Sequence, residues 1–276
     1  MNPPTGPAGP AAARLEAAAG RLIANDVRVS FPGAGRGAPP TVALDGFSID
    51  VAPGEVVAII GPNGCGKSTF LRVAAGLLAP DSGEVTVDRD AIRVPDRRVG
   101  LVFQEPRLLP WRSVAANIAW PLELAGIPRA DARVRVDAML HTVGLTSAAD
   151  LRPVQLSGGM RQRAAIARTL ALAPEVLLLD EPFSALDALT RERFNLELLK
   201  LQERTGTTVV IVTHSIPEAI LLADRVFVMT PRPGRVAGEL RVDAPRPRSL
   251  ATLDGAIASS TAASIRALLQ DGEAAA

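Results

Sequence analysis

Residues 61–69 of the chain read Gly61-Pro62-Asn63-Gly64-Cys65-Gly66-Lys67-Ser68-Thr69. They follow an apolar run at residues 55–60, which predicts a buried strand, and they precede a helical pattern over about residues 67–77. A loop of the form G-x-x-x-x-G-K-S/T between a strand and a helix is typical of a phosphate-binding loop. We therefore expect all nine residues to bind a nucleotide.

Each part of this loop suits a polyphosphate. Glycines let backbone N–H groups approach a phosphate, and the following helix adds its free N–H groups and the positive end of its dipole. Lys67 is one of only two lysines among 30 basic residues, and its compact ammonium suits the β- and γ-phosphates better than a planar guanidinium. The Ser68 hydroxyl is expected to bind Mg²⁺. For the loop as a whole, the alternative is a glycine turn that only connects strand and helix. For Cys65, the alternative to a small loop residue is a redox role.

Two acidic residues end a second apolar run. Residues 176–182 read VLLLDEP, which places Asp180 and Glu181 at the carboxyl end of a strand, where parallel sheets bind their ligands. Asp180 is expected to hold Mg²⁺, and Glu181 to orient or deprotonate an attacking water. The alternative is that both acids cap the next helix. A third apolar run, TTVVIVTH at residues 207–214, ends in His214 at the same sheet edge. His214 is expected to contact the γ-phosphate and the water.

The remaining pattern divides the chain. Strands are expected at residues 26–31, 42–51, 176–180 and 208–213, helices at 188–204 and about 250–269, and a mostly helical stretch at about 113–172 with breaks at 126–128 and 151–159. A strand, a crossover helix and a further strand imply a parallel sheet, hence an α/β fold. We expect a disordered tail at residues 1–21, a nucleotide-binding domain at 22–240 with a helical insertion at about 105–172, and a C-terminal extension at 241–276.

Composition narrows the class of protein. The 276 residues are 47% hydrophobic and 21% charged, a balance typical of a packed globular chain. A formal charge of +1 gives no bulk attraction to nucleic acid, so we expect no nucleic-acid partner. One cysteine and two histidines argue against a disulfide framework or a zinc cluster. No apolar run approaches the ~18 residues of a membrane span, and we expect a cytoplasmic protein that reaches a membrane only through a partner.

Residues 156–163 read LSGGMRQR, a second glycine-bearing turn that opens a helix. With the motifs above, it closely resembles the signature sequence of the ATP-binding-cassette (ABC) ATPases. Gln104 resembles the Q-loop of that family, residues 184–187 its D-loop and His214 its switch histidine. Phe31 lies where the family places an aromatic that stacks on adenine; the alternative is a core residue at a strand end. The resemblance covers about residues 22–240 and implies a P-loop NTPase (RecA-like) parallel sheet core with an antiparallel β subdomain and an inserted α-helical subdomain.

The resemblance also implies a mechanism. Two subunits pair head to tail, and each ATP lies between the phosphate loop of one subunit and the LSGGM turn of the other. Ser157, Gly158, Gly159 and Asp187 are further implied nucleotide-binding residues. Lys67, Gln104, Glu181 and His214 are the implied catalytic residues, and Ser68, Gln104 and Asp180 the implied ligands of Mg²⁺. Hydrolysis removes the bridging phosphate and lets the dimer separate.

Further segments resemble one branch of the family. Residues 95–111, 184–191 and 231–235 are similar to ATPase subunits of nitrate, sulfonate and taurine importers. That similarity implies an integral membrane permease, a periplasmic or lipid-anchored solute-binding protein, and a peripheral position of the ATPase on the cytoplasmic side of the cell membrane. The alternatives are the ATPase of an exporter or lipid-transport complex, and a soluble ABC ATPase acting on nucleic acid.

Two further features remain open at this stage. Residues 105–111 are where the family receives a coupling helix of its permease, so Trp111 belongs either to a docking groove or to the core of the helical subdomain. The arginines after residue 231 form either a basic face near the membrane or a solvated rim; they are Arg232, Arg235, Arg241, Arg246 and Arg248.

Overall fold

A computed structural model describes residues 19–33, 35, 37–184 and 186–274. The expected tail lies outside the described residues as far as residue 18. Its last residues are part of the fold: the Gly20 carbonyl accepts a hydrogen bond of 2.7 Å from the Thr208 hydroxyl, and Arg21 pairs with Asp50 at 2.5 Å. Residues 20 and 21 therefore belong to the fold and not to a tail.

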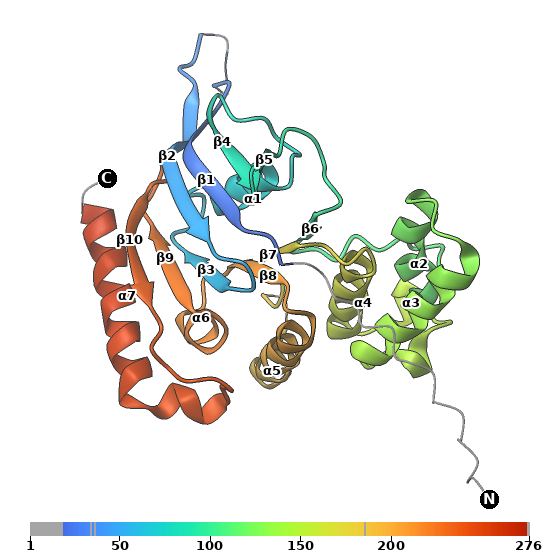
Figure 1. Cartoon of the computed structure of the whole chain (residues 1–276). Coiled ribbons are helices and arrows are strands. Elements are labelled where there is room, and N and C mark those ends of the chain that lie inside the picture. Colours follow the sequence, from blue (N-terminus) through green and yellow to red (C-terminus); the bar gives the residue numbers. More distant parts are fainter. Residues whose placement is uncertain (1–18, 34, 36, 185, 275–276) are drawn as a thin grey trace, which may run out of the picture.

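The main sheet has six strands in the order β10-β9-β3-β8-β7-β6 (Figure 1). All of its strands run parallel except β10, which lies antiparallel on one edge. Successive residues of a strand point to opposite faces, and both faces here are covered, so the central strands are buried throughout. The strands are β3 (Val56–Ile60), β6 (Val99–Val102), β7 (Val176–Asp180), β8 (Thr208–Val212), β9 (Arg225–Met229) and β10 (Val236–Arg241).

A second, antiparallel sheet lies above one face of the main sheet, with the strand order β2-β1-β4-β5 (Figure 1). Its strands are β1 (Leu22–Phe31), β2 (Thr41–Val51), β4 (Ser82–Val87) and β5 (Asp90–Ala91). Helix α1 (Lys67–Ala74) shares one apolar core with both sheets. The rings of Phe47 on β2 and Phe70 on α1 lie 4.6 Å apart, centre to centre.

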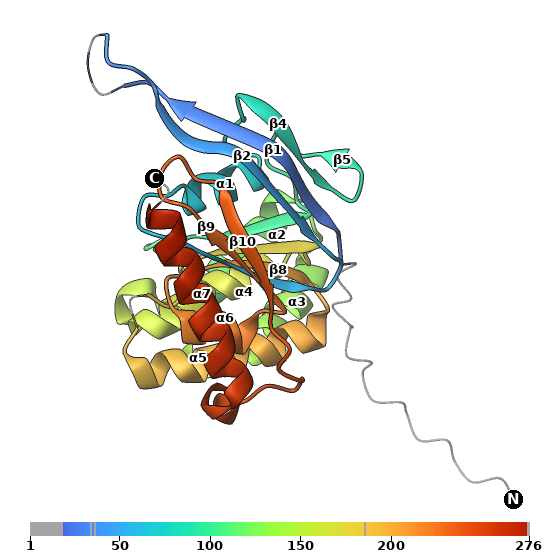
Figure 2. The ribbon, with the colours of Figure 1, turned by 90° about the vertical axis from the view of Figure 1, so that its left-hand side faces the viewer.

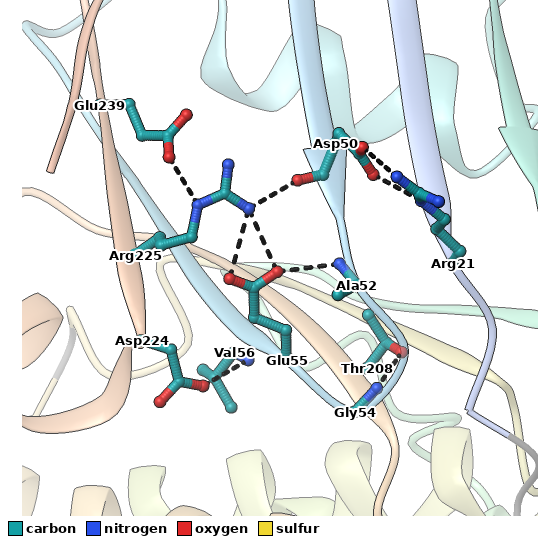
Figure 3. Close-up of polar contacts among 10 residues, drawn as sticks. All are labelled: Arg21, Asp50, Ala52, Gly54, Glu55, Val56, Thr208, Asp224, Arg225 and Glu239. Carbon is teal, nitrogen blue, oxygen red and sulfur yellow. Dashed lines mark hydrogen bonds and ion pairs between the residues drawn. The ribbon is translucent and has the colours of Figure 1, made fainter. Parts of the chain in front are cut away.

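Arg225 joins the two sheets at the amino ends of the parallel strands (Figure 3). Its Nε donates to Glu239 on β10 at 2.7 Å, and its Nη1 donates to the Asp50 carbonyl on β2 at 2.8 Å and to the Glu55 carboxylate at 3.2 Å. Asp50 in turn accepts hydrogen bonds from Arg21, the residue that immediately precedes β1. These contacts fix the sheets to each other at the end opposite the phosphate loop.

Four helices cover the other face of the main sheet (Figures 1 and 2): α4 (Gly158–Leu170), α5 (Ala188–Thr205), α6 (Ile216–Leu222) and α7 (Ala256–Ala274). Helices α2 (Val114–Leu124) and α3 (Arg129–Thr142) pack with α4 at one end of the molecule. The predicted break between them is present, because Gly126 adopts a φ of 71° that favours glycine. The short 3₁₀ helices are η1 (Thr146–Ala148), η2 (Pro153–Gln155) and η3 (Leu250–Asp254). In the described part of the chain, no helix is both long and apolar enough to cross a membrane.

Helix α7 lies along β9, β10 and α6 (Figure 2). Its Ile265 is fully buried in the core cluster that lies under the main sheet. Gly238 on β10 leaves room for Leu268, since an added Cβ would lie 2.7 Å from that side chain. Near its end, a Cβ on Gly272 would lie 3.6 Å from the Cα of Thr230, so α7 reaches the carboxyl end of β9.

The predicted fold class is confirmed, and the elements differ in detail. The sequence pattern does not predict β4, β5, β6, β9 or α6. Strands β5 and β6 have only two and four residues, too few to show a period. Helix α1 ends at Ala74, three residues before the predicted end, because Gly76 turns the chain with a φ of 68°.

Candidate active site

The phosphate loop joins β3 to α1 at the carboxyl edge of the main sheet. Gly66 is the residue that precedes the first turn of α1 and has a φ of 112°, a value that favours glycine. A Cβ on Gly66 would lie 2.7 Å from the Ala43 carbonyl oxygen of β2. Glycine at this position thus lets the loop pass directly beneath the second sheet.

Lys67 is buried within the loop. Its Nζ donates to the carbonyl oxygens of Gly61 at 2.7 Å and Pro62 at 2.8 Å, which draws the loop around the ammonium. Burial raises the pKa of the Cys65 thiol, although the Lys67 charge acts in the opposite direction. A buried, protonated thiol is a poor nucleophile, so the structure favours the small-residue interpretation of Cys65 over a redox role.

Ser68 and Asp180 meet across the sheet edge. The Ser68 hydroxyl donates to Asp180 Oδ1 at 3.0 Å. Burial raises the pKa of Asp180, although the Ser68 hydrogen bond opposes the shift. A hydroxyl and a desolvated carboxyl are oxygen ligands of the kind Mg²⁺ prefers, so this pair fits a magnesium ion bound beside a nucleotide.

Glu181 lies among three other polar side chains. Its Oε2 is 3.3 Å from His214 Nδ1 and 3.5 Å from Gln104 Nε2, and Gln104 also donates to the Ser184 hydroxyl at 3.2 Å. Glu181 has a φ of 43°, an uncommon value for a residue with a side chain. The sequence predicted that Glu181 and His214 share one sheet edge, and the structure brings them together.

The helix-capping alternative for the two acids is wrong. Asp187 caps α5, the helix that follows them, through a hydrogen bond of 3.0 Å that its Oδ1 accepts from the Thr190 N–H. Asp180 and Glu181 are thus left free to face the loop. Among the hydrogen bonds of the described residues, none joins Gln104 to Ser68 or Asp180.

A cavity of about 360 Å³ opens over the phosphate loop. It is lined by Phe31, Thr41, Ala43, Asn63, Gly64, Gly66, Lys67, Ser68, Thr69, Glu181 and Arg232. Phe31 is 38% exposed at the end of β1, so the core-residue alternative for it is wrong. An aromatic ring at one side and a loop of N–H groups at the other suit a nucleotide.

The signature residues lie outside this cavity. Ser157 caps α4 by accepting a hydrogen bond of 3.2 Å from the Met160 N–H. Gly159 packs on Phe194, where an added Cβ would lie 2.6 Å from the ring. Ser157, Gly158, Gly159 and Asp187 are absent from the residues that line the cavity over the loop. One copy of the chain therefore does not bring the two motifs to one ligand.

Sequence reasoning missed Arg232 as a site residue. The sequence places it among the arginines of a basic face or solvated rim, but in the structure these side chains do not share one role. Arg248 is buried and donates to backbone carbonyls, including that of Val242 at 3.1 Å, and Arg246 pairs with Asp224 at 2.9 Å. Trp111 is 69% exposed, so the buried alternative for it is also wrong.

The fold and the site together define a P-loop nucleoside triphosphatase. The chain belongs to the ABC transporter family, whose model matches residues 44–184. A taurine import ATP-binding protein of Roseobacter denitrificans is 46% identical over 200 residues, which are 72% of this chain and 75% of that protein. An aliphatic sulfonates import ATP-binding protein of Xanthomonas axonopodis is 50% identical over 207 residues, 74% of this chain and 82% of that one.

Solved structures agree with this family. A dimeric bacterial ABC transporter cassette matches with a TM-score of 0.71 and 34% identity, covering 80% of this chain and 98% of that chain. A dimeric ATP-binding cassette in a post-hydrolysis state, bound to ADP and phosphate, matches equally well, with a TM-score of 0.71. The chain is thus an ATP-binding, ATP-hydrolysing cassette of the ABC type.

Proposed function

We propose that this ABC ATPase energises the uptake of a small anionic solute, of the nitrate, sulfonate or taurine type, through a separate membrane permease. The observation that carries the hydrolytic part is the grouping of Lys67, the Ser68–Asp180 pair and the Glu181–His214 pair at one sheet edge. The relatives named for taurine and sulfonate import support the direction of transport and the class of solute.

In this proposal each side chain has a separate task. Lys67 binds the β- and γ-phosphates, and Phe31 stacks on the adenine. Ser68, Asp180 and Gln104 hold Mg²⁺, which would neutralise phosphate charge. Glu181 orients and deprotonates the attacking water, and His214, which lies against Glu181, contacts the γ-phosphate.

The working form in this proposal is a head-to-tail homodimer. Ser157 and Asp187 lie outside the cavity over the phosphate loop, so a second copy would supply them to the bound ATP. The free N–H groups at the start of α4 would then face the γ-phosphate from the side opposite Lys67. The dimeric cassettes with which the chain aligns support this arrangement.

The permease would dock beside residues 105–111, the segment that follows Gln104. A cavity of about 410 Å³ there is lined by Leu109, Trp120, Pro121 and Leu124, among others, and exposed Trp111 follows the same loop. The lining also includes Asp96, Arg97 and Arg168, and a groove with both apolar and charged side chains suits a short amphipathic helix of a partner. The ATPase would then lie on the cytoplasmic side of the cell membrane, and a periplasmic or lipid-anchored binding protein would deliver the solute to the permease.

The hydrolytic role is tested by Glu181→Gln. The variant should bind ATP as the wild type does, lose at least about 100-fold in hydrolysis, and elute from gel filtration as an ATP-dependent dimer. Glu192→Gln, on the exposed face of α5, is the matched control and should remain active. A Glu181→Gln variant that hydrolyses ATP at the wild-type rate would refute the assignment.

The transport role is tested by co-purification. Tagged Glu181→Gln, held in the ATP-bound state, should bring down a multi-span permease from native membranes. Recovery of nucleic acid or of soluble proteins alone would contradict the proposal. A permease encoded without a binding-protein gene beside it would instead favour an exporter or lipid-transport complex.

A further inference from the structure

The turn between β9 and β10 is built against the phosphate loop. A Cβ on Gly234 would lie 2.0 Å from the Cys65 carbonyl oxygen, so the backbones of the turn and the loop touch. The Gly234 N–H donates to the Ala43 carbonyl of β2 at 2.9 Å, and the Gly234 carbonyl accepts from the Asp45 N–H at 3.1 Å. The turn is therefore held between β2 and the loop.

Arg232 extends from this turn to the loop itself. Its Nε and Nη2 both donate to the Gly64 carbonyl, at 3.1 and 3.0 Å. The C=O and N–H of a trans peptide point in opposite directions, so fixing the Gly64 carbonyl also fixes the direction of the Cys65 N–H. That N–H donates to the Pro62 carbonyl oxygen within the loop, with an N–O distance of 3.3 Å, so the Arg232 contact fixes a peptide on which the loop's own turn depends.

The position of Arg232 beside the cavity makes its contact with Gly64 relevant to nucleotide binding. The charged residues that line the cavity are Lys67, Glu181 and Arg232. Arg232 contributes a guanidinium at the open side of the cavity, whereas Lys67 is buried in the loop. An anionic ligand entering the cavity therefore meets the Arg232 charge before it reaches the ammonium.

We infer that Arg232 is a further nucleotide-binding residue of this protein, which attracts the polyphosphate and holds the phosphate loop in its binding conformation. The inference rests on the proposed nucleotide site and adds the β9–β10 turn to it. The ligand class is a nucleoside di- or triphosphate.

The test compares the affinities of the full-length chain for ADP and for a non-hydrolysable ATP analogue, measured by calorimetry with Mg²⁺. Arg232→Ala should bind both about tenfold more weakly, the loss typical of a charge-assisted contact. Arg241→Ala, an exposed arginine on β10 that removes the same charge, is the matched control and should bind as the wild type does. Arg232→Lys, which keeps the charge but not the two-donor fork, should fall between the two.

Salt dependence separates a charge from a purely structural role. The advantage of the wild type over Arg232→Ala should shrink as salt rises from about 0.05 to about 0.5 M, because salt screens an exposed charge. Affinities of Arg232→Ala within about twofold of the wild type, an equal loss in Arg241→Ala, or a lysine variant no better than alanine would overturn the inference. Lys67→Ala tests the site itself: if it binds nucleotide normally, the proposed function fails whatever Arg232 does.

Discussion

Glu218 is a buried carboxyl group on α6, four residues after His214. The Thr213 hydroxyl donates to its Oε2, while its Oε1 has no hydrogen-bond partner among the described residues. Burial raises the pKa of Glu218, and the Glu181 charge acts in the same direction, whereas the Thr213 hydrogen bond and the charges of Arg191 and His214 oppose the shift. Without bound nucleotide, the Glu218 carboxyl therefore binds a proton more tightly in the folded protein than in the unfolded one.

This raised pKa predicts a pH dependence of stability. From the ordinary pKa of 4.5 up to the raised value, the folded state binds more protons than the unfolded state, so stability falls as pH rises through that window. Glu218→Gln should flatten the dependence and raise the melting temperature at about pH 8 by about 2 °C. Thermal melts from about pH 5 to about pH 8 measure both. Exposed Glu203→Gln is the control, and an unchanged slope in Glu218→Gln would contradict the argument.

Residue roles could be predicted where the signal is local. Lys67 and Ser68 belong to one short motif, and Asp180 and Glu181 to one strand end, so spacing along the chain was enough to find them. Arg232 could not be found in this way, because its partner Gly64 lies 168 residues earlier. The sequence around Arg232 shows only a proline- and glycine-rich turn, and a turn carries no information about what it packs against.

At the scale of elements, the segment after Gln104 is held at two places. Arg168 on α4 donates to the carbonyls of Arg107 at 2.7 Å and Pro106 at 3.1 Å. Further along, the buried Asn117 of α2 accepts from the Leu109 N–H at 2.7 Å. The segment thus connects the carboxylate site, through Gln104, to the helices on which we propose that the permease docks.

Arg168→Ala should loosen this segment without touching the nucleotide cavity. Amide hydrogen exchange should become about tenfold faster at Leu109, whose N–H is hydrogen-bonded to Asn117, while ATP affinity stays within about twofold of the wild type. Arg168→Lys should not restore protection fully, because an ammonium lacks the fork that reaches both carbonyls. Exposed Arg133→Ala is the control, and unchanged exchange in Arg168→Ala would show that the contact does not order the segment.

Element boundaries were predictable where glycine or proline marks them. Gly126 and Pro128 separate α2 from α3 in both the sequence pattern and the structure. Neither end of strand β6 is a glycine or a proline. Its four residues form a strand because they pair with β7 in parallel. Pairing between distant segments is a tertiary effect that a local pattern does not contain.

At the scale of the whole molecule, α7 belongs to the same core as the ATPase sheet. Ile265→Ala should therefore destabilise the entire protein by about 2–4 kcal/mol, which corresponds to a loss of about 5–15 °C in melting temperature. Calorimetry should show one shifted transition. Ile257→Ala, on the same helix but 44% exposed, is the matched control and should change little. A separate early transition for α7 in Ile265→Ala would mean that residues 241–276 fold independently of the cassette.

The close approach of Gly272 to Thr230 has a practical consequence for handling and labelling the protein. The end of α7 lies against Thr230 and Pro231 in the turn that carries Arg232, so bulky fusions or surface attachment at the carboxyl end would press on the mouth of the nucleotide cavity. An environment-sensitive dye on a cysteine introduced near residue 272 would instead turn this proximity into an optical readout of nucleotide occupancy. An affinity tag placed ahead of the described fold is the better choice, because Gly20 adjoins Thr208 at the amino ends of the parallel strands, away from the cavity.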